Sequence, residues 1–113
     1  MKKNLIYKFR VNFSGSEFYS AKVMNLEDLR AYSNVTSNAK SVRGAIKALN
    51  DDGYRRYANC MVGQVWYADA GKIDVPADEK HTDLTCNSKE SLITSVAIHF
   101  GDNAAAQLKS FLS

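Results

Sequence analysis

The N-terminal segment alternates apolar and polar side chains with a period of two. The apolar side chains occupy the odd positions: Leu5, Tyr7, Phe9, Val11 and Phe13. The even positions between them are polar: Lys8, Arg10 and Asn12. This pattern predicts a strand of an antiparallel sheet, with an apolar face on the core and a basic face in water. The residues 14–16 (Ser-Gly-Ser) predict a turn, and 17–24 the returning strand of a hairpin.

Two helices are expected in the next part of the chain. Asn25 is a helix-capping residue, with Asp28 three residues later to complement the amides of the first turn. A short helix over Leu26, Leu29 and Tyr32 follows, and the polar stretch 33–38 breaks it. A second helix is predicted from about Asn38 to Asn50, ended by Asp51, Asp52 and Gly53. Its apolar residues recur at helical spacing: Ala39, Val42, Ile46 and Leu49.

The middle of the chain is predicted to form strands. Residues 54–62 suit either a helix or a strand, and their tyrosine-rich composition favours a strand. Strands are also predicted over 64–67 and 73–75, joined by a hairpin turn at 69–72 and ended by Pro76.

Residues 76–90 are the most polar segment and show no periodicity, which predicts a long acidic loop of the kind that carries function. Between 92 and 100, apolar residues alternate, which favours a strand. The alternative is a helix with Asn87 and Glu90 as a capping box. A closing helix after Gly101 buries four apolar residues: Ala105, Leu108, Phe111 and Leu112.

Together these elements predict one α+β domain over residues 1–113. We expect an antiparallel sheet of about five strands with two to three helices packed on one face. The length of 113 residues, with 45% hydrophobic and 24% charged residues, is that of an ordinary globular domain. With two cysteines, no signal-peptide pattern and no apolar run of membrane-spanning length, we expect a cytoplasmic protein without a membrane partner.

The sequence carries no catalytic signature. Cys60, His81, Cys86 and His99 are too widely spaced for a structural zinc site. Nucleophile-elbow and phosphate-binding glycine motifs are missing from the sequence, and two histidines allow few acid–base arrangements. We therefore expect no metal, no cofactor and no enzymatic activity. Three carboxylates in the polar loop are weaker candidates for binding a divalent cation: Asp78, Glu79 and Asp83. Solvation of the loop explains them better, because the calcium-loop pattern of alternating oxygen donors is missing.

Basic residues are concentrated in the first half of the chain. Residues 1–60 hold 11 Lys/Arg against 5 Asp/Glu, and residues 61–113 hold 4 against 7. Lys40, Arg43 and Lys47 are spaced to share one face of the second predicted helix. The sequence Tyr54-Arg55-Arg56-Tyr57 interleaves aromatic rings with guanidinium groups, which suits a protein hot spot or stacked bases and phosphates. Trp66 and Tyr67 follow closely and could belong to the same interface anchor. The alternative, favoured for Trp66, is that they are core and sheet-face aromatics.

These observations predict a small non-enzymatic binding protein, a monomer or homodimer. The leading hypothesis is a protein-binding inhibitor or accessory factor that uses the basic Tyr/Arg surface or the acidic loop. Such small domains are common in phages and mobile elements, where they inhibit host defence or nucleic-acid-handling complexes, so this class of partner is the first expectation. The alternative is a nucleic-acid-binding protein that uses the same basic surface.

Overall fold

A computed structural model describes residues 2–12, 14–57, 65–75 and 83–113, with the backbone alone for 53–57. Within these residues, four strands form one antiparallel sheet in the order β3-β1-β2-β4: β1 (Lys2–Val11), β2 (Glu17–Met24), β3 (Val65–Asp74) and β4 (Leu84–Cys86). The helices are α1 (Leu26–Tyr32), α2 (Val42–Tyr57), α3 (Lys89–Phe100) and α4 (Asp102–Leu112), with a short 3-10 helix, η1 (Asn34–Thr36). The predicted α+β class is confirmed, and the described sheet has four strands where about five were predicted.

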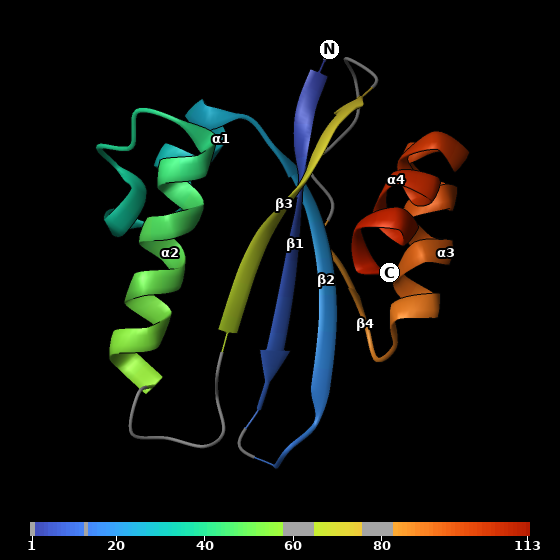
Figure 1. Cartoon of the computed structure of the whole chain (residues 1–113), viewed down its shortest axis with the longest axis horizontal. Helices are drawn as coiled ribbons and strands as arrows, with labels where there is room; N and C mark the ends of the chain where they lie inside the picture. Colours follow the sequence, from blue (N-terminus) through green and yellow to red (C-terminus); the bar gives the residue numbers. More distant parts are fainter. Residues whose placement is uncertain (1, 13, 58–64, 76–82) are drawn as a thin grey trace.

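The helices cover both faces of the sheet. Figure 1 shows α1 and α2 on one side of the strands and α3 and α4 on the other. The prediction that all helices pack on one face is therefore wrong. The reason lies in β1, which buries the adjacent residues Leu5 and Ile6 on opposite sides of the sheet.

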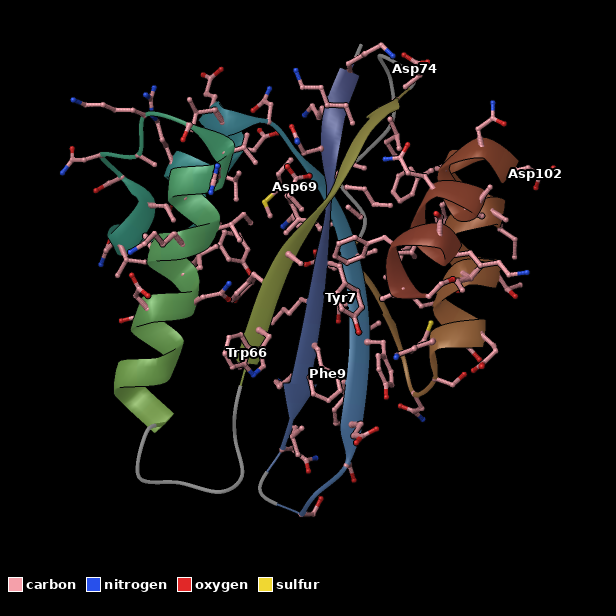
Figure 2. All side chains as sticks on the ribbon, viewed as in Figure 1. Tyr7, Phe9, Trp66, Asp69, Asp74 and Asp102 are labelled. Carbon is pink, nitrogen blue, oxygen red and sulfur yellow. The ribbon has the colours of Figure 1, made fainter. Side chains whose placement is uncertain are left out.

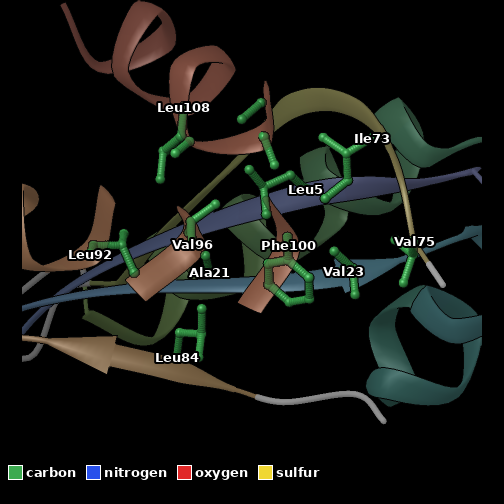
Figure 3. Close-up of a cluster of buried hydrophobic side chains, with 13 residues drawn as sticks. Leu5, Ala21, Val23, Ile73, Val75, Leu84, Leu92, Val96, Phe100 and Leu108 are labelled. Atoms are coloured by element: carbon green, nitrogen blue, oxygen red, sulfur yellow. The ribbon is translucent and has the colours of Figure 1, made fainter. Parts of the chain in front are cut away.

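The larger core fills the space between the sheet and the α3–α4 pair (Figure 3). Leu92, Val96 and Phe100 of α3 face the sheet there, and Leu108 of α4 is fully buried beside them. The sheet contributes Leu5, Ala21, Val23, Ala70, Ile73 and Leu84.

The smaller core lies between the opposite face of the sheet and α1 and α2. It is built from Ile6, Met24, Leu29, Ala45 and Leu49. The cap predicted for α1 is confirmed: Asn25 accepts a hydrogen bond from the Asp28 backbone, and Asp28 accepts one from the Asn25 backbone. The same carboxylate accepts from the largely buried Lys3 ammonium at 2.8 Å, which ties α1 to β1.

Helix α2 begins and ends later than the sequence predicts. It starts at Val42 because Ser41 caps it, its hydroxyl accepting from the Gly44 backbone at 3.0 Å. It continues through Gly53 to Tyr57, with Lys47 and Asp51 paired one turn apart at 3.0 Å. The strand favoured for 54–62 is thus wrong for 54–57, and 58–62 lie outside the described residues.

The hairpin turn predicted at 69–72 is a β-bulge within one continuous strand, β3. The pairing with β1 shifts there, so that Ala70 and Gly71 lie between the pairs Asp69–Ile6 and Lys72–Asn4. Gly71 has a φ of +102°, and its N–H donates to the Asp69 carboxylate at 2.9 Å. The turn-type residues therefore bend the strand without reversing it.

Residues 92–100 form helix α3, so the predicted strand is wrong and the alternative helix is right. Its buried residues are Leu92, Val96 and Phe100, whose spacing of four fits an alternating pattern and a helical face equally well. The cap is Ser88, which accepts from the Ser91 backbone at 3.1 Å, in place of the expected Asn87. The predicted loop at 76–90 is also interrupted, because residues 84–86 form β4.

Candidate functional site

Aromatic side chains form a row across three strands on the sheet face that carries α3 and α4. Phe9 of β1 is paired with Tyr19 of β2 on one side and with Trp66 of β3 on the other. Directly paired residues project from the same face of a sheet, so the three side chains lie together. Tyr7, two residues along β1, lies on this face too. With Phe111 of α4, which contacts Tyr7, these residues make up what we call the aromatic surface.

Two pairs of rings on the aromatic surface are in contact, and Trp66 and Phe111 are partly open to solvent. The Phe9 and Tyr19 ring centroids are 5.3 Å apart, and those of Tyr7 and Phe111 are 6.2 Å apart in an edge-to-face arrangement. Trp66 is 51% exposed and Phe111 is 43% exposed. In Figure 2, Phe9 and Trp66 lie in the lower half of the sheet and Tyr7 lies above them, near its middle. Helix α4 contacts the aromatic surface at Tyr7, through Phe111.

Carboxylates lie beside the aromatic surface. The Tyr19 hydroxyl donates to the Glu17 carboxylate at 2.7 Å, and this hydrogen bond raises the pKa of Tyr19 to about 12, with Glu17 and Glu90 adding repulsion of the phenolate. Burial, followed by the charge of Glu17, raises the pKa of Tyr7 as well. Glu17 and Glu90 are both exposed, so the aromatic surface has an acidic margin.

The opposite face of the sheet carries three cations beside the smaller core, and each lies over an aromatic ring. The Lys8 ammonium is 5.5 Å from the Tyr67 ring centroid. The Arg10 guanidinium is 5.0 Å from that of Phe18, and the Lys22 ammonium is 5.4 Å from that of Tyr32. Each ring holds a cation in place at the surface without neutralising its charge. The first strand was predicted to present a basic face to water. Arg10 is exposed as predicted, whereas Lys8 is half-buried and Ile6 on the same face packs against α1 and α2, so the prediction is right only in part.

The structure separates the predicted basic candidates. Arg43 and Lys47 are exposed one turn apart on α2, whereas Lys40 lies before the helix starts, so the three do not share one helical face. The backbone of 54–57 is the last turn of α2. The side chains of Tyr54, Arg55, Arg56 and Tyr57 lie outside the described residues, so their role stays a prediction.

Of the acidic loop candidates, Asp83 is described and pairs with Lys22 at 3.5 Å. Asp78 and Glu79 lie outside the described residues.

Two of the four cysteines and histidines, Cys60 and His81, also lie outside the described residues. Cys86 is half-buried, with its Sγ 3.5 Å from the Ser95 hydroxyl. The strand predicted between 92 and 100 would place His99 on a sheet face; instead His99 lies on α3, where its ring contacts the Ser95 carbonyl one turn back. Among the described residues, no three His, Cys, Asp or Glu side chains gather as metal ligands would.

No protein-family model, curated protein or solved structure matches the chain. Among the described residues there is also no helix with the length and apolar character needed to span a membrane.

Trp66 was an alternative member of an interface anchor with residues 54–57, but its place beside Phe9 was not predicted. Trp66 lies on a sheet face, as one interpretation of the sequence predicted. It is not a core residue, because half of its side chain is exposed. The alternation on β1 places Phe9 on the apolar face, but only the pairing register brings Trp66 beside it. That register depends on the bulge at Ala70 and Gly71, which the sequence suggests is a turn.

Proposed function

We propose that this chain is a non-enzymatic protein-binding module that acts by occupying a surface of its partner through the aromatic surface. The observation that carries the proposal is the half-exposed Trp66, which is paired with Phe9 in a row of aromatic residues across three strands. Tryptophan and tyrosine are enriched at binding hot spots because they remove a large apolar area from water at little cost in side-chain entropy. A partly covered row of such rings is the typical centre of a protein interface.

The acidic margin indicates the chemistry of the partner. Glu17 and Glu90 lie beside Tyr19, so a partner with an apolar patch bordered by lysine or arginine is complementary. Proteins that handle nucleic acid present such basic surfaces. This supports, as a proposal, an inhibitor or accessory factor directed at a host nucleic-acid-handling or defence complex.

The test is affinity capture of the tagged full chain from a lysate of its natural host, with nuclease present throughout. Trp66→Ala is compared with Ile98→Ala, because Ile98 is an apolar side chain 75% exposed on α3, away from the aromatic surface. A stoichiometric protein captured by the wild type and by Ile98→Ala, and lost with Trp66→Ala, supports the proposal. Equal capture by all three contradicts it. An Arg55→Ala/Arg56→Ala double variant tests the basic anchor in the same experiment.

A second candidate function is nucleic-acid binding by the basic face. The observation in its favour is the set of three cation–aromatic pairs formed by Lys8, Arg10 and Lys22. This function requires affinity for an oligonucleotide that decreases steeply with salt, because each neutralised phosphate releases counterions. Capture that nuclease abolishes favours this second function over the first.

A further inference from the structure

A small hollow on the basic face brings together cationic and hydroxyl side chains from several elements. It has a volume of about 100 Å³, well above the roughly 10–15 Å³ that one water molecule needs. Lys8 of β1 and Ser20 and Lys22 of β2 line it from the sheet, with Thr85 of β4. Tyr32 of α1 and Tyr67 of β3 complete the group. We call these six residues the basic pocket. It lies on the face opposite the aromatic surface, so it is independent of the proposed protein interface, and it shares Lys8 and Lys22 with the second candidate function.

The sheet register sets the geometry of the basic pocket. Lys8 pairs directly with Ser20 and with Tyr67, and Ser20 pairs with Thr85, so the four side chains form one polar row across all four strands. Lys22 is two residues from Ser20 on β2, which makes it a diagonal neighbour of Lys8 on the same face. The Lys8 ammonium lies over the Tyr67 ring and the Lys22 ammonium over the Tyr32 ring, and both lysines line the same hollow as the Ser20 and Thr85 hydroxyls.

The hydroxyl groups leave donors available to a ligand. The Ser20 and Thr85 oxygens are 3.2 Å apart, and one of them donates to the other. The accepting hydroxyl then keeps its own proton for a further bond. The phenol oxygens of Tyr32 and Tyr67 are 3.4 Å apart and line the same hollow. Two cations and convergent hydroxyl donors in one small hollow make up the donor set that a tetrahedral oxyanion requires.

One carboxylate also lines the hollow. Asp83 pairs with Lys22 at 3.5 Å, and its side chain is 68% exposed, compared with 28% for Lys22. Asp83 is thus paired with Lys22 on the solvent side of the hollow. An anion that enters can replace Asp83 as the partner of Lys22, and little binding free energy is lost because an exposed ion pair is weak. Among the described residues, no ion pair engages Lys8, whose ammonium lies over the Tyr67 ring.

We infer that the basic pocket binds a small phosphate-type oxyanion, held by Lys8 and Lys22 with the Ser20–Thr85 hydroxyl pair as donor. Inorganic phosphate and a phosphate monoester share this chemistry and carry more charge than the phosphodiester of a nucleic-acid strand. Two ammonium groups around a hollow of this size favour the small dianion.

The experiment is a titration of the full chain with inorganic phosphate, followed by amide NMR at constant ionic strength set with chloride. We expect saturable shifts centred on Ser20, Lys22 and Thr85. Lys8→Met keeps the apolar stem over Tyr67 and removes the charge, so we expect the affinity to decrease by about tenfold, as for loss of a charge-assisted hydrogen bond. Lys47→Met on α2 is the matched control and leaves the affinity unchanged.

Asp83→Asn is expected to increase the affinity for phosphate, an effect that a misfolded variant would not produce. Removing the competing carboxylate frees Lys22, so phosphate binds about threefold more tightly, in line with the strength of an exposed ion pair. Equal effects of Lys8→Met and Lys47→Met, or shifts that do not saturate, would overturn the proposal. A short single-stranded oligonucleotide forms the second arm. Binding of the oligonucleotide at these amides with no response to inorganic phosphate also overturns it, in favour of an extended nucleic-acid site.

Discussion

Leu5 and Ile6 are neighbours on β1, and each is buried in a different hydrophobic core. Leu5 is 0% exposed and packs against α3 and α4, whereas Ile6 is 2% exposed and packs against α1 and α2. Because successive residues of a strand project to opposite faces, this pair joins the two helical layers through a single peptide unit. The central strand is therefore the element on which both halves of the fold depend.

Truncating either residue is expected to destabilise the protein through a different layer. Leu5→Ala and Ile6→Ala should each lower the free energy of unfolding by about 2–5 kcal/mol, measured in urea, because each leaves a cavity in a closed core. Amide NMR should place the changes around Leu92 and Leu108 for Leu5→Ala, and around Leu29 and Leu49 for Ile6→Ala. The same set of shifted amides in both variants would contradict two separate cores.

Asn50 of α2 protects the outer edge of β3. Its side-chain oxygen accepts from the Tyr67 N–H at 2.7 Å, and its amide donates to the Tyr67 carbonyl at 2.9 Å, as a neighbouring strand would. Asn50→Ala should cost about 1–3 kcal/mol of stability by leaving both backbone groups without this partner. It should also promote self-association through the opened edge, detected by sedimentation. Asn103→Ala, at an exposed asparagine of α4, is the control that should do neither.

Gly71 is expected to tolerate a side chain less well than Gly15. Both have positive φ, +102° and +86°, so alanine introduces backbone strain of about 1–2 kcal/mol at each. At Gly71 the added Cβ also meets the Gln107 side-chain nitrogen at 2.5 Å, whereas nothing lies within 4 Å at Gly15. Gln107 donates to the Ala70 carbonyl at 2.7 Å, so its displacement breaks a contact between α4 and β3. Thermal unfolding should show the larger loss for Gly71→Ala, and equal losses would contradict the bulge geometry.

The hairpin of β1 and β2 and the cap of α1 could be predicted because each rests on contacts close in sequence. The sequence did not predict that helices cover both faces of the sheet. On the second face of β1 the only apolar residue among the even positions 4–12 is Ile6, so the pattern there is that of a solvent-facing side. Helix α3 was predicted as a strand because a spacing of four residues satisfies both periodicities. The aromatic surface joins Phe9 and Trp66, 57 positions apart, and only tertiary pairing brings them together.

The Tyr19–Glu17 hydrogen bond should be visible in a titration. A pKa raised from 10.0 to about 12 means that the folded state favours the neutral phenol. The stability it contributes is complete below pH 10 and is lost as the pH rises from 10 to about 12. Glu17→Gln should lower the pKa of Tyr19 toward 10, measured by phenolate absorbance with Tyr19→Phe to assign the signal. A titration unchanged by Glu17→Gln would show that this bond does not hold the proton.

The most direct test of the aromatic surface uses Trp66, the single tryptophan of the chain. Fluorotryptophan incorporated into this chain alone allows fluorine NMR to follow that side chain free and in complex with the captured partner. We predict that partner binding shifts the fluorine signal and removes its dependence on solvent, because the exposed half of the indole becomes buried. A signal that stays solvent-accessible in a stoichiometric complex would mean that the partner binds elsewhere, and the aromatic surface would not be the interface.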